Sequence, residues 1–271
     1  MAQPNRLCYK RELCLSPKEF RMSKGSIRLQ SVGIIPARYA SSRFAGKPLA
    51  NLLGKPMVQH VYESACRAKM LNEVIVATDD ERIYDTVTQF GGNVEMTGPC
   101  ATGTERVAVV AEGLRCDIVA NIQGDEPLLE PAQIDLMLQP FIDRPEVEVC
   151  TLKQRVETPT DYRDVNVVKV VTNLQGDALY FSRASIPGRI GADELHKFPV
   201  YRHVGLYAYR REHLLAFTKW KSTPYELAEG LEQLRFLEHG VPIHVVETDT
   251  PLIGVDVPAD LERVKHILEA K

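Results

Sequence analysis

The sequence lacks the features that mark several large classes of protein. Its apolar runs fall well short of the roughly 20 residues that a helix needs to cross a bilayer, so we expect no membrane span. Its six cysteines form no CxxC pair and no cluster with histidine at zinc-binding spacing, which favours reduced thiols in the cytoplasm. The Walker pattern GxxxxGK[ST], internal repeats and low-complexity tracts are also missing.

Net charge and composition restrict the remaining choices. A formal charge of −3 gives little general attraction for nucleic acid, although it leaves room for a local basic pocket that binds a small anion. Hydrophobic residues make up 44% and charged residues 25%, as in an ordinary globular protein. We predict a single domain over residues 31–271, preceded by a basic, flexible extension at 1–30 that lacks the apolar segment of a secretory signal.

From residue 31 the sequence alternates between two kinds of periodicity. Short β-branched runs at 32–36, 73–78 and 117–122 predict buried strands, and the segments 55–68 and 83–90 between them have the apolar spacing of helices. This alternation is typical of an α/β fold in which helices cover a mainly parallel sheet.

The second half of the sequence is richer in strands. Candidate strands at 165–172, 178–182 and 203–209 follow one another without long helices between them. They predict a mixed or antiparallel extension, around residues 165–240, that forms one side of a substrate pocket or a subunit interface. A last strand near 243–247 and a helix from Pro258 return the chain to the main sheet.

A loop rich in cations and small residues follows the first predicted strand. Arg38, Arg43 and Lys47 supply three positive charges, and Gly46 with its small neighbours lets a ligand approach the backbone. This combination suits a triphosphate. The alternative is a solvated basic turn, but the position at the end of a strand favours phosphate binding, because ligands of open α/β sheets gather there.

Two aspartates are candidates for a magnesium site. Asp125 follows the buried strand at 117–122, and Asp256 lies in the GVDVP segment near the other end of the sequence. Carboxylate oxygens are the ligands that Mg²⁺ prefers. The alternative is that both cap turns or helices; for Asp256, capping the helix from Pro258 is at least as plausible from the sequence.

The TGTER segment opens another predicted helix. Thr104 can cap that helix, or Gly103 and Arg106 can let a base or phosphate approach the backbone, and the residues alone leave both interpretations open. Single residues further along, such as a histidine between apolar neighbours, are more often structural than catalytic.

Eight segments together carry a resemblance to a known family. The sequence resembles 3-deoxy-manno-octulosonate (Kdo) cytidylyltransferases over residues 31–271. The matching segments are, in family order, RYASSRFAGKP (38–48), TGTER (102–106), QGDEP (123–127), NVVKVV (166–171), YFSRASIP (180–187), RHVGLY (202–207), LEQLR (231–235) and GVDVP (254–258). QGDEP alone is moderately specific, whereas the ordered set is strong.

The resemblance implies a fold and an activity. The expected fold is a nucleotide-diphospho-sugar transferase-like (Rossmann-like) three-layer α/β sandwich, usually in a cytoplasmic homodimer. The expected reaction uses Mg²⁺ and transfers CMP from CTP to the anomeric hydroxyl of Kdo, giving CMP-Kdo and pyrophosphate for lipopolysaccharide biosynthesis. Neither nucleic acid nor a membrane is expected as a partner.

The resemblance also assigns roles to individual residues. It implies catalytic roles for Arg38, Lys47 and Asp125 and magnesium binding by Asp125 and Asp256. The implied nucleotide contacts are Arg38, Arg43, Lys47, Thr102, Gly103 and Arg106. The implied contacts with the acidic sugar are Gln123, Arg183, His203, Tyr207, Glu232 and Gln233.

Two other functions remain open at this stage. Within enzymes, the acceptor could be 8-amino-Kdo or a sialic acid, since the nucleotide and metal parts would serve each of them. From a different class, the chain could be a non-catalytic nucleotide-binding module that keeps the fold. The two aspartates and the Lys/Arg set argue against a pure binding module.

Overall fold

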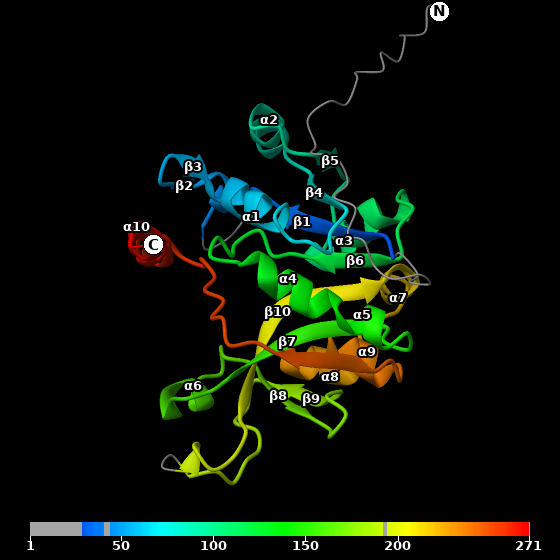
Figure 1. Ribbon diagram of the computed structural model, residues 1–271, viewed down its shortest axis with the longest axis vertical. Coiled ribbons are helices and arrows are strands. Elements are labelled where there is room, and N and C mark those ends of the chain that lie inside the picture. Colours follow the sequence, from blue (N-terminus) through cyan, green and yellow to red (C-terminus); the bar gives the residue numbers. More distant parts are fainter. Residues whose placement is uncertain (1–28, 41–43, 192–193, 271) are drawn as a thin grey trace, which may run out of the picture.

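The computed structural model describes residues 29–40, 44–191 and 194–270. Within them, nine strands form one sheet in the order β11-β7-β10-β6-β1-β4-β5, and β8 and β9 join it through β10 (Figure 1). The bounds of these strands are β1 (Ser31–Ala37), β4 (Glu73–Thr78), β5 (Val94–Met96), β6 (Ile118–Asn121), β7 (Val149–Arg155), β8 (Lys169–Thr172), β9 (Ala178–Ser182), β10 (Tyr201–Arg210) and β11 (Ile243–Glu247). A separate small sheet pairs β2 (Asn51–Leu52) with β3 (Lys55–Pro56).

The helices complete the element order. Their bounds are η1 (Lys47–Leu49), α1 (Met57–Ala65), α2 (Glu81–Gln89), α3 (Gly103–Glu112), α4 (Pro131–Leu138), α5 (Pro140–Asp143), α6 (Pro159–Arg163), α7 (Arg211–Phe217), α8 (Pro224–Glu229), α9 (Leu234–Glu238) and α10 (Pro258–Glu269). None of the described helices is long and apolar enough to cross a membrane.

The sheet is mixed and mainly parallel, as the sequence predicted. Strand β1 pairs in parallel with β4 and β6, β4 with β5, and β7 with β11. Only β10 runs against its neighbours in the main path, pairing antiparallel with β6 and β7. The expected antiparallel extension is also present, because β8 pairs antiparallel with both β10 and β9.

Apolar residues on both faces of the sheet build two cores. One core takes its helical residues from α1, α2, α4 and α5, and the other from α3, α7 and α9. Helix α1 contributes Val58, Val61 and Ala65, whose spacing of three and four residues places them on one face. The molecule is therefore a three-layer α/β sandwich, with the fold class that the sequence predicted.

Some elements differ from the sequence-based expectations. Strand β8 begins only at Lys169, because the chain turns before it and the backbone N–H of Asn166 donates to the Asp164 side chain. Helix α1 begins after Pro56 rather than at residue 55. Strand β7 was not predicted, since Thr151 and Lys153 interrupt its apolar run, yet it is buried between β10 and β11. Of the basic extension expected at 1–30, only residues 29 and 30 lie within the described residues.

Candidate functional site

The carboxyl ends of three strands bring the predicted site loops to one edge of the sheet. Parallel pairing aligns Ala37 of β1 with Thr78 of β4, and Ile34 of β1 with Asn121 of β6. The loops that follow these strands therefore start side by side, as expected for the ligand-binding edge of an open α/β sheet.

The first of these loops presents Lys47 to the two candidate metal ligands. Gly46 adopts a left-handed backbone (φ 71°) that suits glycine, and η1 begins directly after it. The Lys47 Nζ lies 2.5 Å from Asp125 Oδ2 and 3.8 Å from Asp256 Oδ1. It also donates to the backbone carbonyl of Val255 at 2.9 Å. One ammonium group thus joins segments from both ends of the domain.

The segment that carries Asp256 is held firmly against the loop after β6. The backbone N–H of Val255 donates to the carbonyl of Asp125 at 2.8 Å. Val255 is buried in a small apolar cluster with Leu52, Met57 and α10 residue Val264. Because Val257 rather than Asp256 is the N-cap of α10, the helix-capping interpretation of Asp256 is wrong.

The two aspartates fit a divalent cation. Their carboxylates converge on one positive group, and their side chains are 32% and 57% exposed, so both can reach a substrate in solution. Mg²⁺ usually takes one or two protein carboxylates and completes its shell with water and phosphate oxygens. The described residues hold no group of three or more metal-ligating side chains.

Glu126 follows Asp125 directly in the chain, and its carboxyl group has a shifted pKa. Burial raises its pKa well above the usual range and the charge of Asp125 adds to the shift, while Arg202 and Lys47 oppose it. The raised pKa favours the protonated form of Glu126.

The start of α3 carries three residues that were expected to contact the nucleotide, namely Thr102, Gly103 and Arg106. Thr102, not Thr104, caps the helix, since its hydroxyl accepts from the backbone N–H of Glu105 at 3.1 Å. The Arg106 guanidinium is buried, 2.7 Å from the carboxylate of Asp79, and it also donates to the hydroxyl of Thr97. Arg106 therefore ties α3 to the residues that follow β4 and β5.

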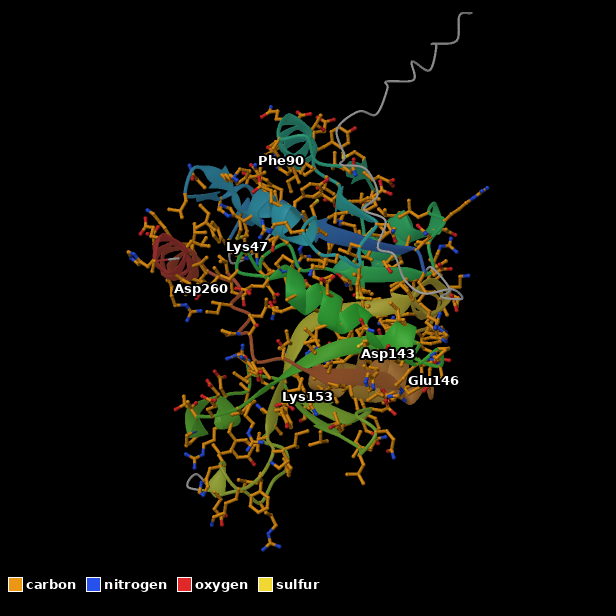
Figure 2. All side chains as sticks on the ribbon, viewed as in Figure 1. Lys47, Phe90, Asp143, Glu146, Lys153 and Asp260 are labelled. Carbon is orange, nitrogen blue, oxygen red and sulfur yellow. The ribbon has the colours of Figure 1, made fainter. Side chains whose placement is uncertain are left out.

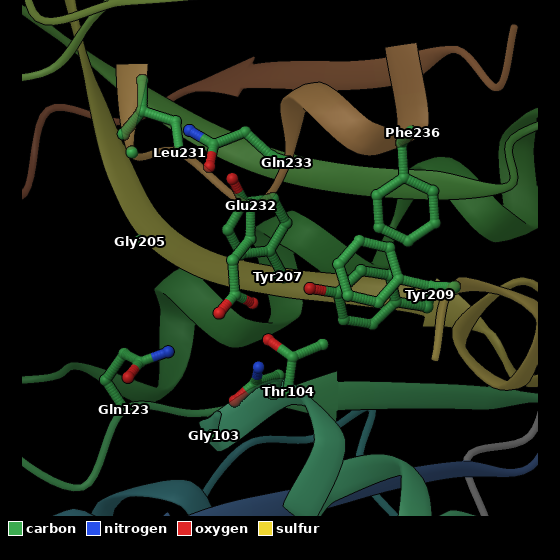
Figure 3. Close-up of a pocket in the computed structure, with 13 residues that line it drawn as sticks. Gly103, Thr104, Gln123, Gly205, Tyr207, Tyr209, Leu231, Glu232, Gln233 and Phe236 are labelled. Atoms are coloured by element: carbon green, nitrogen blue, oxygen red, sulfur yellow. The ribbon is translucent and has the colours of Figure 1, made fainter. Parts of the chain in front are cut away.

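A cavity of about 290 Å³ opens beside the start of α3 and the end of β6 (Figure 3). Five residues predicted from the resemblance line it, namely Gly103, Gln123, Tyr207, Glu232 and Gln233. The other lining residues are Thr104, Asn121, Gly205, Tyr209, Phe217, Gly230, Leu231 and Phe236. Gln123 is two residues from Asp125, so the cavity adjoins the carboxylate pair.

Two polar atoms of this cavity lack partners within the described part of the chain. Nε2 of Gln233 and Oδ1 of Asn121 are buried without a hydrogen bond. Buried polar groups are normally paired, so such a concentration in one cavity indicates a polar ligand. Burial also raises the pKa of Glu232, although a hydrogen bond from Thr104 opposes that shift. In Figure 3 the Glu232 carboxylate points toward Thr104 across the cavity.

His203 and Arg183 stand behind the cavity rather than in its lining. His203 Nε2 lies 3.1 Å from the hydroxyl of Thr151, and its ring packs between those of Phe181 and Tyr207. Burial lowers the pKa of His203 to about 3, so the imidazole is neutral near pH 7. The described contacts make His203 a packing partner of Tyr207.

Arg183 supports the turn that leads to Glu232 and Gln233. Its guanidinium donates to the backbone carbonyls of Glu229, Gly230 and Val165, at 2.8, 3.4 and 3.2 Å. Of the remaining predicted residues, Arg38 has an exposed side chain just beyond β1, and Arg43 lies outside the described residues.

Sequence reasoning missed some residues that complete the site. Asp79 and Asn121 each stand at the end of a predicted strand, so their position was a signal that could have singled them out. The carbonyl of Val255 had no such signal, because a backbone oxygen carries no sequence information.

Comparisons with known proteins agree with the fold and the motifs. A family model of cytidylyltransferases matches residues 32–244. A 3-deoxy-manno-octulosonate cytidylyltransferase from Geobacter metallireducens is 52% identical over 245 residues, covering 87% of this chain and 96% of that protein. One from Solibacter usitatus is 49% identical over 240 residues, covering 88% and 94%.

Solved structures extend the comparison to three dimensions. CMP:2-keto-3-deoxy-manno-octonic acid synthetase complexed with CTP matches with a TM-score of 0.85 and 42% identity, covering 89% of this chain and 99% of that one. A 4-diphosphocytidyl-2C-methyl-D-erythritol synthase from Anaerococcus prevotii, at 14% identity and a TM-score of 0.61, shares the fold alone. About half of the aligned residues are identical to those of the Geobacter and Solibacter proteins, over most of the chain. The chain therefore belongs to the 3-deoxy-manno-octulosonate cytidylyltransferase family.

Proposed function

We propose that this protein transfers CMP from CTP to the anomeric hydroxyl of Kdo, releasing pyrophosphate. The observation that carries the proposal is the convergence of Lys47, Asp125 and Asp256 next to a polar cavity that contains Gln123, Tyr207, Glu232 and Gln233. The relatives named above are enzymes of this activity, and one matching structure is a complex with CTP.

Different residues of the chain would neutralise the phosphate charge and orient the sugar in this reaction. The anomeric hydroxyl attacks the α-phosphorus of CTP in line, and pyrophosphate leaves on the opposite side, so no covalent enzyme intermediate is needed. Lys47, with Arg38 and Arg43, balances the charge of the triphosphate and of the leaving pyrophosphate. The cavity lined by Gln123 orients the sugar, so that its anomeric hydroxyl is held close to the α-phosphate of CTP.

Magnesium is the cofactor that the two aspartates fit. Asp125 and Asp256 would hold the ion together with phosphate oxygens of CTP. When bound, Mg²⁺ would polarise the α-phosphate and lower the pKa of the sugar hydroxyl. Lys47 would then turn from the aspartates toward the phosphates, since the same carboxylate oxygens serve either cation.

One observation favours 8-amino-Kdo as a second candidate acceptor. None of the thirteen described residues that line the cavity is Lys, Arg or His, whereas Glu232 offers a carboxyl group inside it. An ammonium group on the sugar would pair with Glu232 and keep it ionised. A hydroxyl in the same place would only exchange hydrogen bonds with it.

We further propose that the protein works as a homodimer. Among the described strands β9 is laddered only with β8, and a single bridge joins Asp177, just before β9, to His244 of β11, so most of the other edge of β9 is open. Leu174, Leu179, Tyr225 and Leu227, on β9, the turn before it and α8, are more than half exposed. An open strand edge with apolar neighbours is a favourable surface for a second copy. The supply of CTP places the reaction in the cytoplasm, where CMP-Kdo would feed lipopolysaccharide assembly.

The decisive experiment is an assay of pyrophosphate release with CTP and Mg²⁺. Kdo, 8-amino-Kdo and a sialic acid are offered separately and then in competition. Release with Kdo supports the main proposal, and preference for 8-amino-Kdo supports the second candidate. Tight binding of CTP with no release from any of the three sugars would instead support a non-catalytic nucleotide-binding module.

A further inference from the structure

We infer that Arg82, a residue of α2 outside the predicted site, is a positioning residue for the phosphate-binding loop and acts through Tyr39. This inference rests on the proposed use of CTP, because it concerns the loop that presents Lys47. It assigns a role to a side chain that none of the motifs contains.

The Arg82 guanidinium is fixed in place by its own helix end. Asp80 caps α2 by accepting from the backbone N–H of Arg82 at 3.0 Å. The same carboxylate accepts from Nε and Nη2 of Arg82 at 2.9 and 2.6 Å. Such a two-pronged contact sets the plane of the guanidinium as well as its position. Asp80 therefore holds Arg82 in one orientation.

That orientation lays Arg82 on the ring of Tyr39. The guanidinium carbon is 3.3 Å from the ring centroid, which is the geometry of a cation–π stack. Tyr39 lies two residues beyond β1, in the loop that leads to Lys47. The stack therefore joins the end of β4, through α2, to the loop after β1.

Tyr39 in turn meets Gly46, the residue before Lys47. The backbone N–H of Gly46 donates to the carbonyl of Tyr39 at 2.9 Å, and a Cβ added at Gly46 would lie 3.1 Å from the Tyr39 ring. The ring thus rests against the backbone that begins η1. A shift of this ring would move Gly46, and with it the Lys47 side chain that contacts Asp125.

Four proteins test the inference: wild type, R82A, Tyr39→Leu and the double variant. Losing an exposed cation–π contact should raise the KM for CTP about two- to fivefold in R82A. The kcat and the KM for Kdo should change less than twofold. Because Arg82 acts through Tyr39, R82A should add almost nothing in the Tyr39→Leu background.

Hydrogen exchange gives a readout that does not need turnover. The amide of Gly46 should exchange faster in R82A than in wild type, without CTP or metal present. Arg82→Lys should lie between the two, because it keeps the charge but loses the flat, two-pronged contact. Arg144→Ala is the matched control: Arg144 also pairs with a carboxylate two residues away, Glu146, on the side of the molecule opposite Lys47 (Figure 2).

The outcomes separate this inference from the proposed function. An unchanged KM for CTP with unchanged Gly46 exchange in R82A would overturn it. So would an equal effect of R82A with and without Tyr39, since Arg82 would then act on the substrate directly. If the wild-type protein released no pyrophosphate at all, the proposed function would fail, and the exchange rates would still decide the role of Arg82.

Discussion

At the scale of single residues, Lys47 is the positive charge between the two candidate metal ligands of the site. Its ammonium lies between two carboxylates that compete for it, and each of them is also a candidate ligand for a divalent cation. Removing one carboxylate would therefore weaken the proposed magnesium site without uncovering apolar surface. Activity and stability should respond separately to such changes.

We predict that Asp125→Asn abolishes turnover and leaves the fold intact. The amide keeps the size of the side chain but cannot supply the charge that a divalent cation needs, so kcat should fall by at least about 100-fold. Pyrophosphate release and circular dichroism are the measurements. Asp143→Asn, an exposed carboxylate far from Lys47 in Figure 2, is the control. Near-normal turnover in Asp125→Asn would remove the metal assignment.

His203 makes a prediction about pH. Its pKa is lowered to about 3 by burial, whereas an unfolded histidine titrates near 6.5, so only the unfolded chain takes up this proton between those values. The free energy of unfolding should fall as the pH drops below about 6.5, and His203 should account for about 2 kcal/mol of that loss at pH 5.

Denaturant unfolding of His203→Gln at pH 7.5 and pH 5 measures this contribution. The variant should lose less stability than wild type on acidification, whatever its stability at pH 7.5. His266→Gln, whose imidazole is 77% exposed, is the control for the loss of a histidine. Equal losses in wild type and His203→Gln would show that the buried imidazole does not resist protonation.

At the scale of elements, the loop after β6 depends on close contact with β1. A Cβ at Gly124 would lie 3.1 Å from the backbone carbonyl oxygen of Pro36 and 3.3 Å from the Ile35 side chain. Both distances are shorter than an ordinary van der Waals contact. Because a backbone oxygen cannot move aside cheaply, the loop itself would have to shift. Asp125 is the next residue.

We therefore predict that Gly124→Ala lowers kcat about 10- to 100-fold, since small displacements of positioning groups are costly. Steady-state kinetics and thermal unfolding should show a larger effect on rate than on stability. The control is Gly113→Ala, where the added Cβ would be 3.7 Å from its nearest contact. A kcat within twofold of wild type would mean that the loop adapts.

The element scale also shows how far sequence reasoning reaches. Strands β4, β9 and β11 have the predicted bounds. Strand β7 escaped prediction, since its polar residues are buried through contacts from far along the chain. The Thr151 hydroxyl, for example, donates to the carbonyl of Leu206 at 2.8 Å.

The candidate site was predictable only where motifs or strand ends marked it. Asp125 was singled out by the end of a strand and Asp256 by its motif, and the structure brings both carboxylates to Lys47. The partners of Arg106 could not be foreseen, because the pairing with Asp79 depends on how α3 packs beside the end of β4. The same is true of Arg183, whose acceptors are backbone carbonyls.

At the scale of the whole molecule, the open edge of β9 predicts the oligomeric state. Leu179→Lys places a charge on that edge, where the side chain is 62% exposed, and should convert a dimer into a monomer. Sedimentation velocity measures the change. Ile142→Lys, an exposed apolar residue of α5, should remain dimeric. A wild-type protein that sediments as a monomer would contradict the proposal at once.

The contact of Lys47 with Val255 and Asp256 has a consequence for how the protein is made. A ribosome releases the chain from its N-terminal end, so the sheet strands from β1 to β11 emerge before the segment that supplies these two groups. A chain cut short before residue 255 would keep most of its core and lack one of its two carboxylates for a cation. The proposed cation site would therefore be completed only near the end of synthesis.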